Sequence, residues 1–145
     1  MAVHFEVEYV AAVGGLLVGA FVAWLTAGRL KRAESWDARL TLPLVLAAGA
    51  AHVVLIPVVE LQRQVLFALY FVAMAGVFTL GALRLSIWRA GAVIFPAGSI
   101  FAYFYFAAVA HEADVIGLVV KVVEAGAIAA AIGGALMYRR RRSMA

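Results

Sequence analysis

Five apolar runs alternate with short polar segments along this chain. The runs cover about residues 9–28, 41–59, 65–83, 92–110 and 115–138. Each is close to the roughly 20 residues that a helix needs to cross a hydrocarbon core of about 30 Å. Because lipid offers the backbone no hydrogen-bond partners, such runs must form helices. The pattern predicts one all-α domain over residues 1–145, a polytopic membrane bundle of about five helices.

Local signals indicate where some of these helices begin and turn. Thr41 and Pro43 are typical of a cap followed by a first-turn proline, and they predict the start of the second helix. The link at residues 60–64 is short enough to force an antiparallel hairpin. The first run is full length and ends in basic residues, so we expect a retained helix instead of a cleaved signal peptide.

Lysine and arginine are distributed unequally between alternate links. One side holds ten of them and the other holds only Arg63. The ten are Arg29, Lys31, Arg32, Arg39, Arg84, Arg89, Arg139, Arg140, Arg141 and Arg142. The positive-inside rule predicts that these ten face the cytoplasm, with the N-terminus outside and the plasma membrane as the location. The four terminal arginines are also expected to attract anionic lipid headgroups.

Composition agrees with a membrane protein and excludes several kinds of function. Of the 145 residues, 67% are hydrophobic and 14% are charged, against roughly a quarter charged in soluble domains. The net charge of +4 comes from clusters in the links, so nucleic acid is not an expected partner. The absence of cysteine excludes disulfides and thiolate metal sites. No nucleophile–base pair, phosphate loop or paired-histidine helix indicates an enzyme.

Small residues recur at helical spacing in the first and fifth runs. Gly15 and Gly19 are four apart, and Gly126, Ala130 and Gly134 repeat this spacing. Glycine and alanine allow two helix backbones to approach closely, which promotes helix association in lipid. These two helices are therefore predicted to pack tightly.

Three ionisable residues lie inside the predicted spans: His52 in the second, and Lys121 and Glu124 in the fifth. A rise of about 1.5 Å per residue lets them share one level in the outer half of the membrane. Asp114, Lys121 and Glu124 also share a helix face. Charges at this depth cost at least about 2.5–3.5 kcal/mol, so such residues usually pair and face the bundle interior. These four residues form a candidate intramembrane polar site.

Two interpretations of this site stay open. In the structural one, Lys121 and Glu124 neutralise each other and His52 is a buried hydrogen-bonding residue. In the functional one, His52 and Glu124 pass protons or hold a cation, since histidine titrates near neutrality. The polar residues would then line a path for the ion.

Cofactor binding is a further hypothesis. His4, His52 and His111 all fall in the predicted outer half, where they could hold copper or another metal. Two axial haem ligands must lie at one depth, but His111 is roughly 12 Å above His52 by helix rise. His52 with Met74 is the remaining candidate pair for haem.

From Ala51 onward the order of features resembles a group of small, uncharacterised prokaryotic multi-spanning membrane proteins. The shared features are Ala51-His52, Ile56-Pro57, Glu60, and then Gly117, Lys121 and Glu124 in a last helix that ends in arginines. Members carry a second histidine directly after the proline, whereas Val58 and Val59 stand here, so a metal role implied by that histidine does not carry over. The resemblance implies that His52, Pro57, Lys121 and Glu124 are the positions of interest, but no activity.

The leading hypothesis for function is a non-catalytic subunit or accessory protein of a membrane complex, such as a respiratory one, or a homo-oligomer. The alternative is a small proton or ion transporter or channel that uses His52, Lys121 and Glu124. A membrane redox protein that binds haem or copper is third. Expected partners are membrane lipids and either further copies of the chain or other membrane subunits.

Overall fold

The computed structural model describes residues 9–10, 13–22, 24–25, 36–110 and 115–143, and they are all that is discussed below. Their regular secondary structure is entirely helical. It consists of an N-terminal helix with the stretch Val13–Val22, then α2 (Trp36–Leu55), the short 3-10 helix η1 (Ile56–Val58), α3 (Leu61–Ala82), α4 (Trp88–Ala110) and α5 (Val115–Ser143). The predicted all-α class is confirmed for this part of the chain.

Four of these helices are long and apolar enough to cross a membrane. The stretches that meet this condition are Ala38–Leu55, Leu61–Ala82, Trp88–Val109 and Val115–Met137. The apolar stretch Val13–Val22 of the N-terminal helix is shorter, and the predicted run 9–28 extends into residues outside the description. A fifth crossing therefore stays a prediction.

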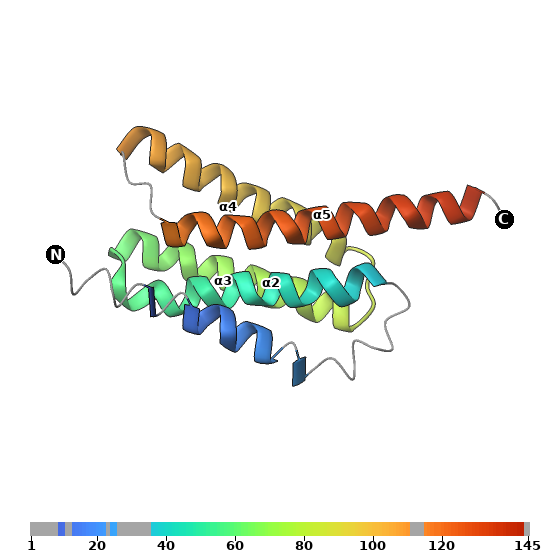
Figure 1. Cartoon of the computed structure of the whole chain (residues 1–145), viewed down its shortest axis with the longest axis horizontal. Helices are drawn as coiled ribbons and strands as arrows, with labels where there is room; N and C mark the ends of the chain where they lie inside the picture. Colours follow the sequence, from blue (N-terminus) through green and yellow to red (C-terminus); the bar gives the residue numbers. More distant parts are fainter. Residues whose placement is uncertain (1–8, 11–12, 23, 26–35, 111–114, 144–145) are drawn as a thin grey trace.

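Consecutive helices run antiparallel and form a four-helix bundle with the N-terminal helix beside it (Figure 1). Helix α2 packs against α3 and α5, and α4 packs against the same two helices. Helices α2 and α4 are therefore diagonal to each other, with α3 and α5 between them. This arrangement lets all four long helices contribute side chains to one interior.

The ends of α2 differ from the sequence prediction. The helix begins at Trp36, and Thr41 and Pro43 lie inside it instead of capping it. Pro43 cannot donate a hydrogen bond to the carbonyl of Arg39, four residues earlier, and its ring crowds that carbonyl. The other end is at Leu55, short of residue 59, because Pro57 lacks an N–H and disfavours α geometry in the residue before it.

The core of the bundle is apolar in the half where α2 and α4 begin. Its buried members come from all four helices and are Ala38, Leu42, Val45, Met74, Val77, Trp88, Ala92, Ala127 and Ala131. Two glycines allow the large side chains to fit. A Cβ at Gly81 would lie 2.5 Å from Leu42 Cδ2, and one at Gly49 would lie 2.9 Å from Met74 Cβ. This half of the interior is therefore closely packed.

The N-terminal helix packs closely on α2. A Cβ added to Gly15 would lie 2.7 Å from Ala51 Cα, and one added to Gly19 would lie 2.5 Å from Ala47 Cα. Both distances are too short for any side chain larger than hydrogen. Alanines with the same spacing of four thus face the two glycines, and the small residues on both helices allow backbone contact.

The small residues of α5 face α2 less tightly. A Cβ at Gly126 would lie 3.7 Å from Leu44 Cδ1, which is an ordinary van der Waals contact. Ala130 and Gly134 are both buried. The close backbone approach at Gly15 and Gly19 therefore does not recur at Gly126.

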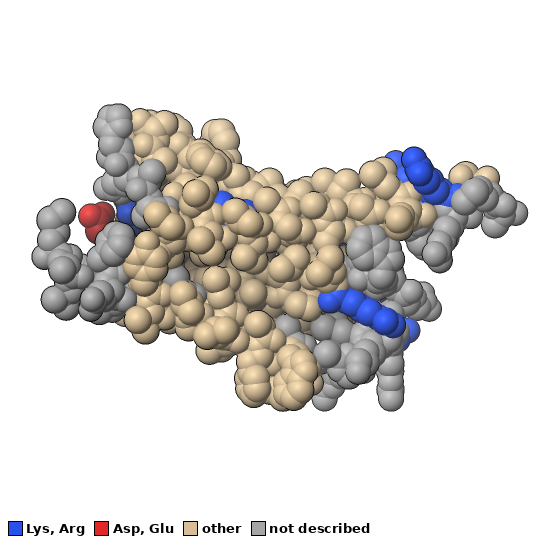
Figure 2. Space-filling view, viewed as in Figure 1, with Lys and Arg blue, Asp and Glu red and all other residues tan. Residues whose placement is uncertain are grey.

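Charged side chains gather at the two ends of the bundle (Figure 2). The described arginines at the ends of α3 and α5 and the starts of α2 and α4 lie at one end, and Glu60 and Arg63 lie at the other. The middle of the visible face shows almost no charged side chains. This distribution is the one expected for helices surrounded by lipid.

Candidate functional site

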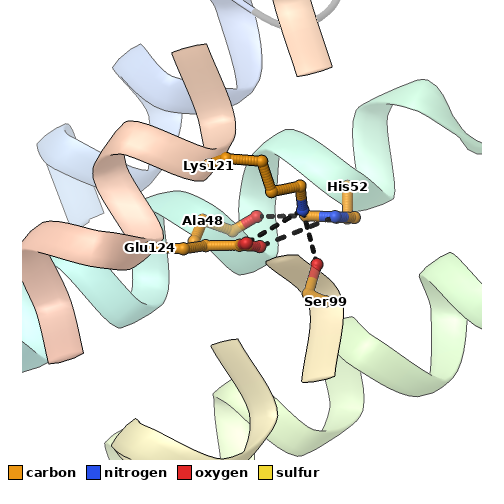
Figure 3. A network of polar contacts seen from close by, with 5 residues as sticks. All are labelled: Ala48, His52, Ser99, Lys121 and Glu124. Carbon is orange, nitrogen blue, oxygen red and sulfur yellow. Dashed lines mark hydrogen bonds and ion pairs between the residues drawn. The ribbon is translucent and has the colours of Figure 1, made fainter. Parts of the chain in front are cut away.

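A cluster of polar side chains lies inside the bundle, where α2 and α5 meet. Helix α2 supplies His52, and α5 supplies Lys121 and Glu124. Lys121 Nζ donates a hydrogen bond of 2.8 Å to Glu124 Oε2, and His52 Nε2 lies 3.8 Å from Glu124 Oε1. The structure thus brings together the three ionisable residues that the sequence placed at one level (Figure 3).

The hydrogen bond made by Nδ1 of His52 fixes the ring so that its other nitrogen, Nε2, faces Glu124. Nδ1 lies 2.8 Å from the carbonyl oxygen of Ala48, one turn earlier in α2. A carbonyl oxygen can only accept, so Nδ1 must carry the hydrogen of this bond. Nε2 therefore presents a lone pair to Glu124 when the ring is neutral and a proton when it is charged.

Helix α4 adds Ser99, which sequence reasoning did not find. Its hydroxyl oxygen accepts a hydrogen bond from Lys121 Nζ, so the ammonium group links α4 to Glu124 on its own helix. Figure 3 shows these groups converging from three helices. The available signal was that Ser99 is the single serine or threonine in the fourth apolar run.

Helix α3 adds aromatic rings against the histidine. The ring of Tyr70 lies 4.3 Å from that of His52, and Phe67 approaches it edge-on at 4.9 Å. Within the described part of the chain, the Tyr70 hydroxyl and Glu124 Oε1 are buried and have no hydrogen-bond partner. Sequence reasoning missed Tyr70 because a tyrosine in an apolar run carries no charge that demands a partner.

The ion pair at the centre of this cluster is almost completely enclosed. The side chain of Glu124 is 0% exposed and that of Lys121 is 8% exposed. Lys121 Nζ also lies 5.9 Å above the centre of the Tyr103 ring, a distance at which a cation is attracted to the ring face. Removal of one partner from a buried pair typically costs about 3–5 kcal/mol.

A cavity of about 350 Å³ leads from this cluster to one end of the bundle. His52, Tyr70, Ser99 and Lys121 line its inner part. Its outer part is lined by residues near the end of α4 and the starts of α3 and α5, namely Val59, Arg63, Phe106, Ile116 and Gly117. The opposite half of the interior is filled by the apolar core. The cavity therefore approaches the ion pair from the end that carries Glu60.

Several residues named from the sequence lie outside this cluster or outside the description. Asp114, His4 and His111 are not among the described residues, and neither are the side chains of Arg141 and Arg142. Arg139 and Arg140 are exposed near the end of α5. The described residues thus show the polar site without its fourth predicted member, Asp114.

Metal and haem ligation were also considered from the sequence. Within the described ranges, histidine and acidic residues form no group of three that could hold a metal ion. Met74, the candidate haem partner of His52, is fully buried in the apolar core and does not line the cavity. The set His4, His52 and His111 stays a prediction, because His4 and His111 lie outside the described residues.

Comparisons of the chain with protein-family models, curated proteins and solved structures gave no match. Function is therefore inferred from the geometry of the polar cluster and its cavity.

Proposed function

We propose that this chain is a multi-pass protein of the cell membrane that moves protons, or another small cation, by way of His52, Lys121 and Glu124. The observation that carries the proposal is a buried ion pair at the inner end of a cavity. A pair that served only to join helices would not need an approach from outside. Intramembrane ionisable residues that border cavities often mark paths for ions and protons.

The contact between His52 and Glu124 favours a proton as the transferred species. When the imidazole is neutral, the Nε2 lone pair faces an unpartnered carboxylate oxygen at 3.8 Å. Two acceptors that face each other in a low dielectric repel, and one added proton turns the contact into a donor–acceptor pair. Lys121 on α5 and Tyr70 on α3 border the same contact. The ammonium of Lys121 opposes a proton on His52, so we expect uptake to depend on the attraction of the Glu124 carboxylate.

The proposed orientation gives this path a direction. The N-terminus lies outside and the basic ends of α3 and α5 lie in the cytoplasm, so the cavity opens outward. Leu42, Met74 and Val77 fill the cytoplasmic half of the interior. Release to that side requires the packed half to open, which favours a carrier that alternates between two states over a permanent pore.

Proton flux in reconstituted vesicles tests this proposal. The purified protein is placed in liposomes with a pH-sensitive dye inside, and a pH gradient is imposed. Glu124→Gln and His52→Ala are expected to lower the flux at least tenfold, toward that of protein-free vesicles. Glu60→Gln, the same chemical change at an exposed carboxylate, serves as the matched control and should keep the parent flux. If Glu124→Gln keeps it too, the proposal is refuted.

A second candidate is a non-catalytic subunit of a membrane complex or a homo-oligomer. It is favoured by helices α3 and α4, which turn most of their residues away from the bundle interior. Exposed glycines on these helices, Gly76 and Gly98, would leave room for a neighbouring helix because no atom lies within 4 Å of an added Cβ. The mass of the particle in native-lipid discs tests this candidate, which fails if the protein is monomeric and free of partners.

A further inference from the structure

The cavity above the ion pair has the volume and the lining of a site for a small organic molecule. Its volume of about 350 Å³ falls in the range of ligand pockets, about 300–1,000 Å³. Four aromatic side chains line it, namely Phe67, Tyr70, Tyr103 and Phe106. Flat rings of this kind suit a planar, largely apolar ligand.

The charges on the cavity lining select the sign of that ligand. Arg63 near the outer end and Lys121 at the inner end are the charged residues among the described lining, and both are cations. The carboxylate of Glu124 is completely buried and does not line the space. A ligand that enters meets Arg63 first and Lys121 last. Because Lys121 lines the space and its partner Glu124 does not, the inner end favours an anion over a cation.

From this arrangement we propose that the cavity binds a small planar organic anion, such as an aromatic carboxylate, and takes up one proton with it. This inference rests on the proposed carrier function, for which it names the substrate class. The anion would place its carboxylate near Lys121 Nζ and Ser99 Oγ, which already share a hydrogen bond. Its ring would lie between the aromatic side chains of α3 and α4.

Charge balance explains why a proton should accompany the anion. At the buried inner end Lys121 and Glu124 sum to zero, so an anion bound there alone would leave one net negative charge in a low-dielectric interior, which is costly. A proton on His52 restores neutrality and gives Glu124 Oε1 a hydrogen-bond donor. The groups that face this proton from the packed helices are Glu124 and Lys121 on α5, Tyr70 on α3 and Ser99 on α4. Among them Glu124 is the only carboxylate.

Binding to the protein in lipid nanodiscs tests this inference without any pH gradient. The probes are benzoate, benzyl alcohol and benzylamine, which share a ring but carry negative, neutral and positive groups. Equilibrium dialysis against empty nanodiscs corrects for partition into lipid. Benzoate is expected to bind about tenfold or more tightly than benzyl alcohol, which is the factor typical of a hydrogen bond to a charged group. Benzylamine should bind most weakly.

Variants connect this preference to the cavity. Lys121→Met combined with Glu124→Gln removes both buried charges together. The ratio of benzoate affinity to benzyl alcohol affinity should then fall close to one. Arg63→Met, at the less buried outer end, should lower benzoate affinity several-fold even if the double variant does not fold. Arg139→Met removes an exposed arginine far from the cavity and is the control. Equal binding of the three probes, or a benzoate preference that is unchanged in Arg63→Met, would overturn the inference.

The coupled proton gives an independent readout. In weakly buffered solution, benzoate binding should take up about one proton per molecule bound, and His52→Ala should abolish this uptake. Absence of benzoate binding with Glu124-dependent proton flux intact would remove the substrate class and leave the carrier function. Benzoate binding without proton flux would support the substrate class but refute the carrier function, and would indicate a binding protein.

Discussion

The Nε2 atom of His52 faces Oε1 of Glu124 at 3.8 Å across the contact between α2 and α5. This distance is beyond hydrogen-bond length, and the other carboxylate oxygen is already paired with Lys121. The histidine is held in place by its bond to Ala48 and by the rings of Phe67 and Tyr70. A fixed acceptor beside an unsatisfied carboxylate oxygen is the basis of the proton proposal.

Lys121→Met should destabilise the protein strongly, because Glu124 would keep a buried negative charge without its partner. The expected loss is about 3–5 kcal/mol. The double variant Lys121→Met/Glu124→Gln should recover most of it, since no charge then remains in the interior. Thermal unfolding in detergent, followed by circular dichroism, compares the three proteins. A single variant as stable as the parent would show that the pair contributes little to folding.

Tyr70→Phe should leave stability unchanged within about 1 kcal/mol, because the hydroxyl is buried close to Glu124 and Ser99 but forms no hydrogen bond of standard geometry within the described part of the chain. The ring contact with His52 is kept. The same unfolding assay measures the change. A loss above about 2 kcal/mol would mean that the hydroxyl has a hydrogen-bond partner, such as a bound water or ligand.

Gly19→Ala should separate the N-terminal helix from α2. The added Cβ would lie 2.5 Å from Ala47 Cα, a backbone atom that cannot move without shifting the whole helix. Gly14→Ala is the matched control, since nothing lies within 4 Å of its added Cβ. Protection of the first helix from limited proteolysis should fall for Gly19→Ala only. Equal behaviour of the two variants would argue against the close helix contact.

Arg84→Gly should stabilise the turn between α3 and α4. Arg84 has φ of 62°, the only positive φ at a non-glycine residue in the described part of the chain. Its N–H bonds to Gly81 O and that of Leu85 bonds to Leu80 O, which together form a Schellman motif. Glycine adopts this left-handed conformation without the penalty of about 1 kcal/mol that a Cβ imposes. The melting temperature should rise for Arg84→Gly and not for Arg84→Ala.

The sequence by itself determined the class of the fold and the approximate level of the ionisable residues. Hydrophobic length is sufficient for the first, because an apolar run of about 20 residues has few alternatives to a spanning helix. Helix rise is sufficient for the second, since each residue adds about 1.5 Å of depth. The start of α2 could not be read in this way, because Thr41 and Pro43 are compatible with both a cap and a position inside the helix.

Only the tertiary structure decided which way each helix turns its side chains. The rotation of a helix about its axis depends on packing against its neighbours, and neither depth nor composition determines it. That rotation brings Ser99 to Lys121, packs the tilted ring of Tyr70 against His52 and places Gly15 and Gly19 against the alanines of α2. It also leaves a cavity above the ion pair and an apolar core below it. The two halves differ because Leu42, Met74 and Trp88 fill the core in one half, whereas the side chains of the other half leave a space of about 350 Å³ between them.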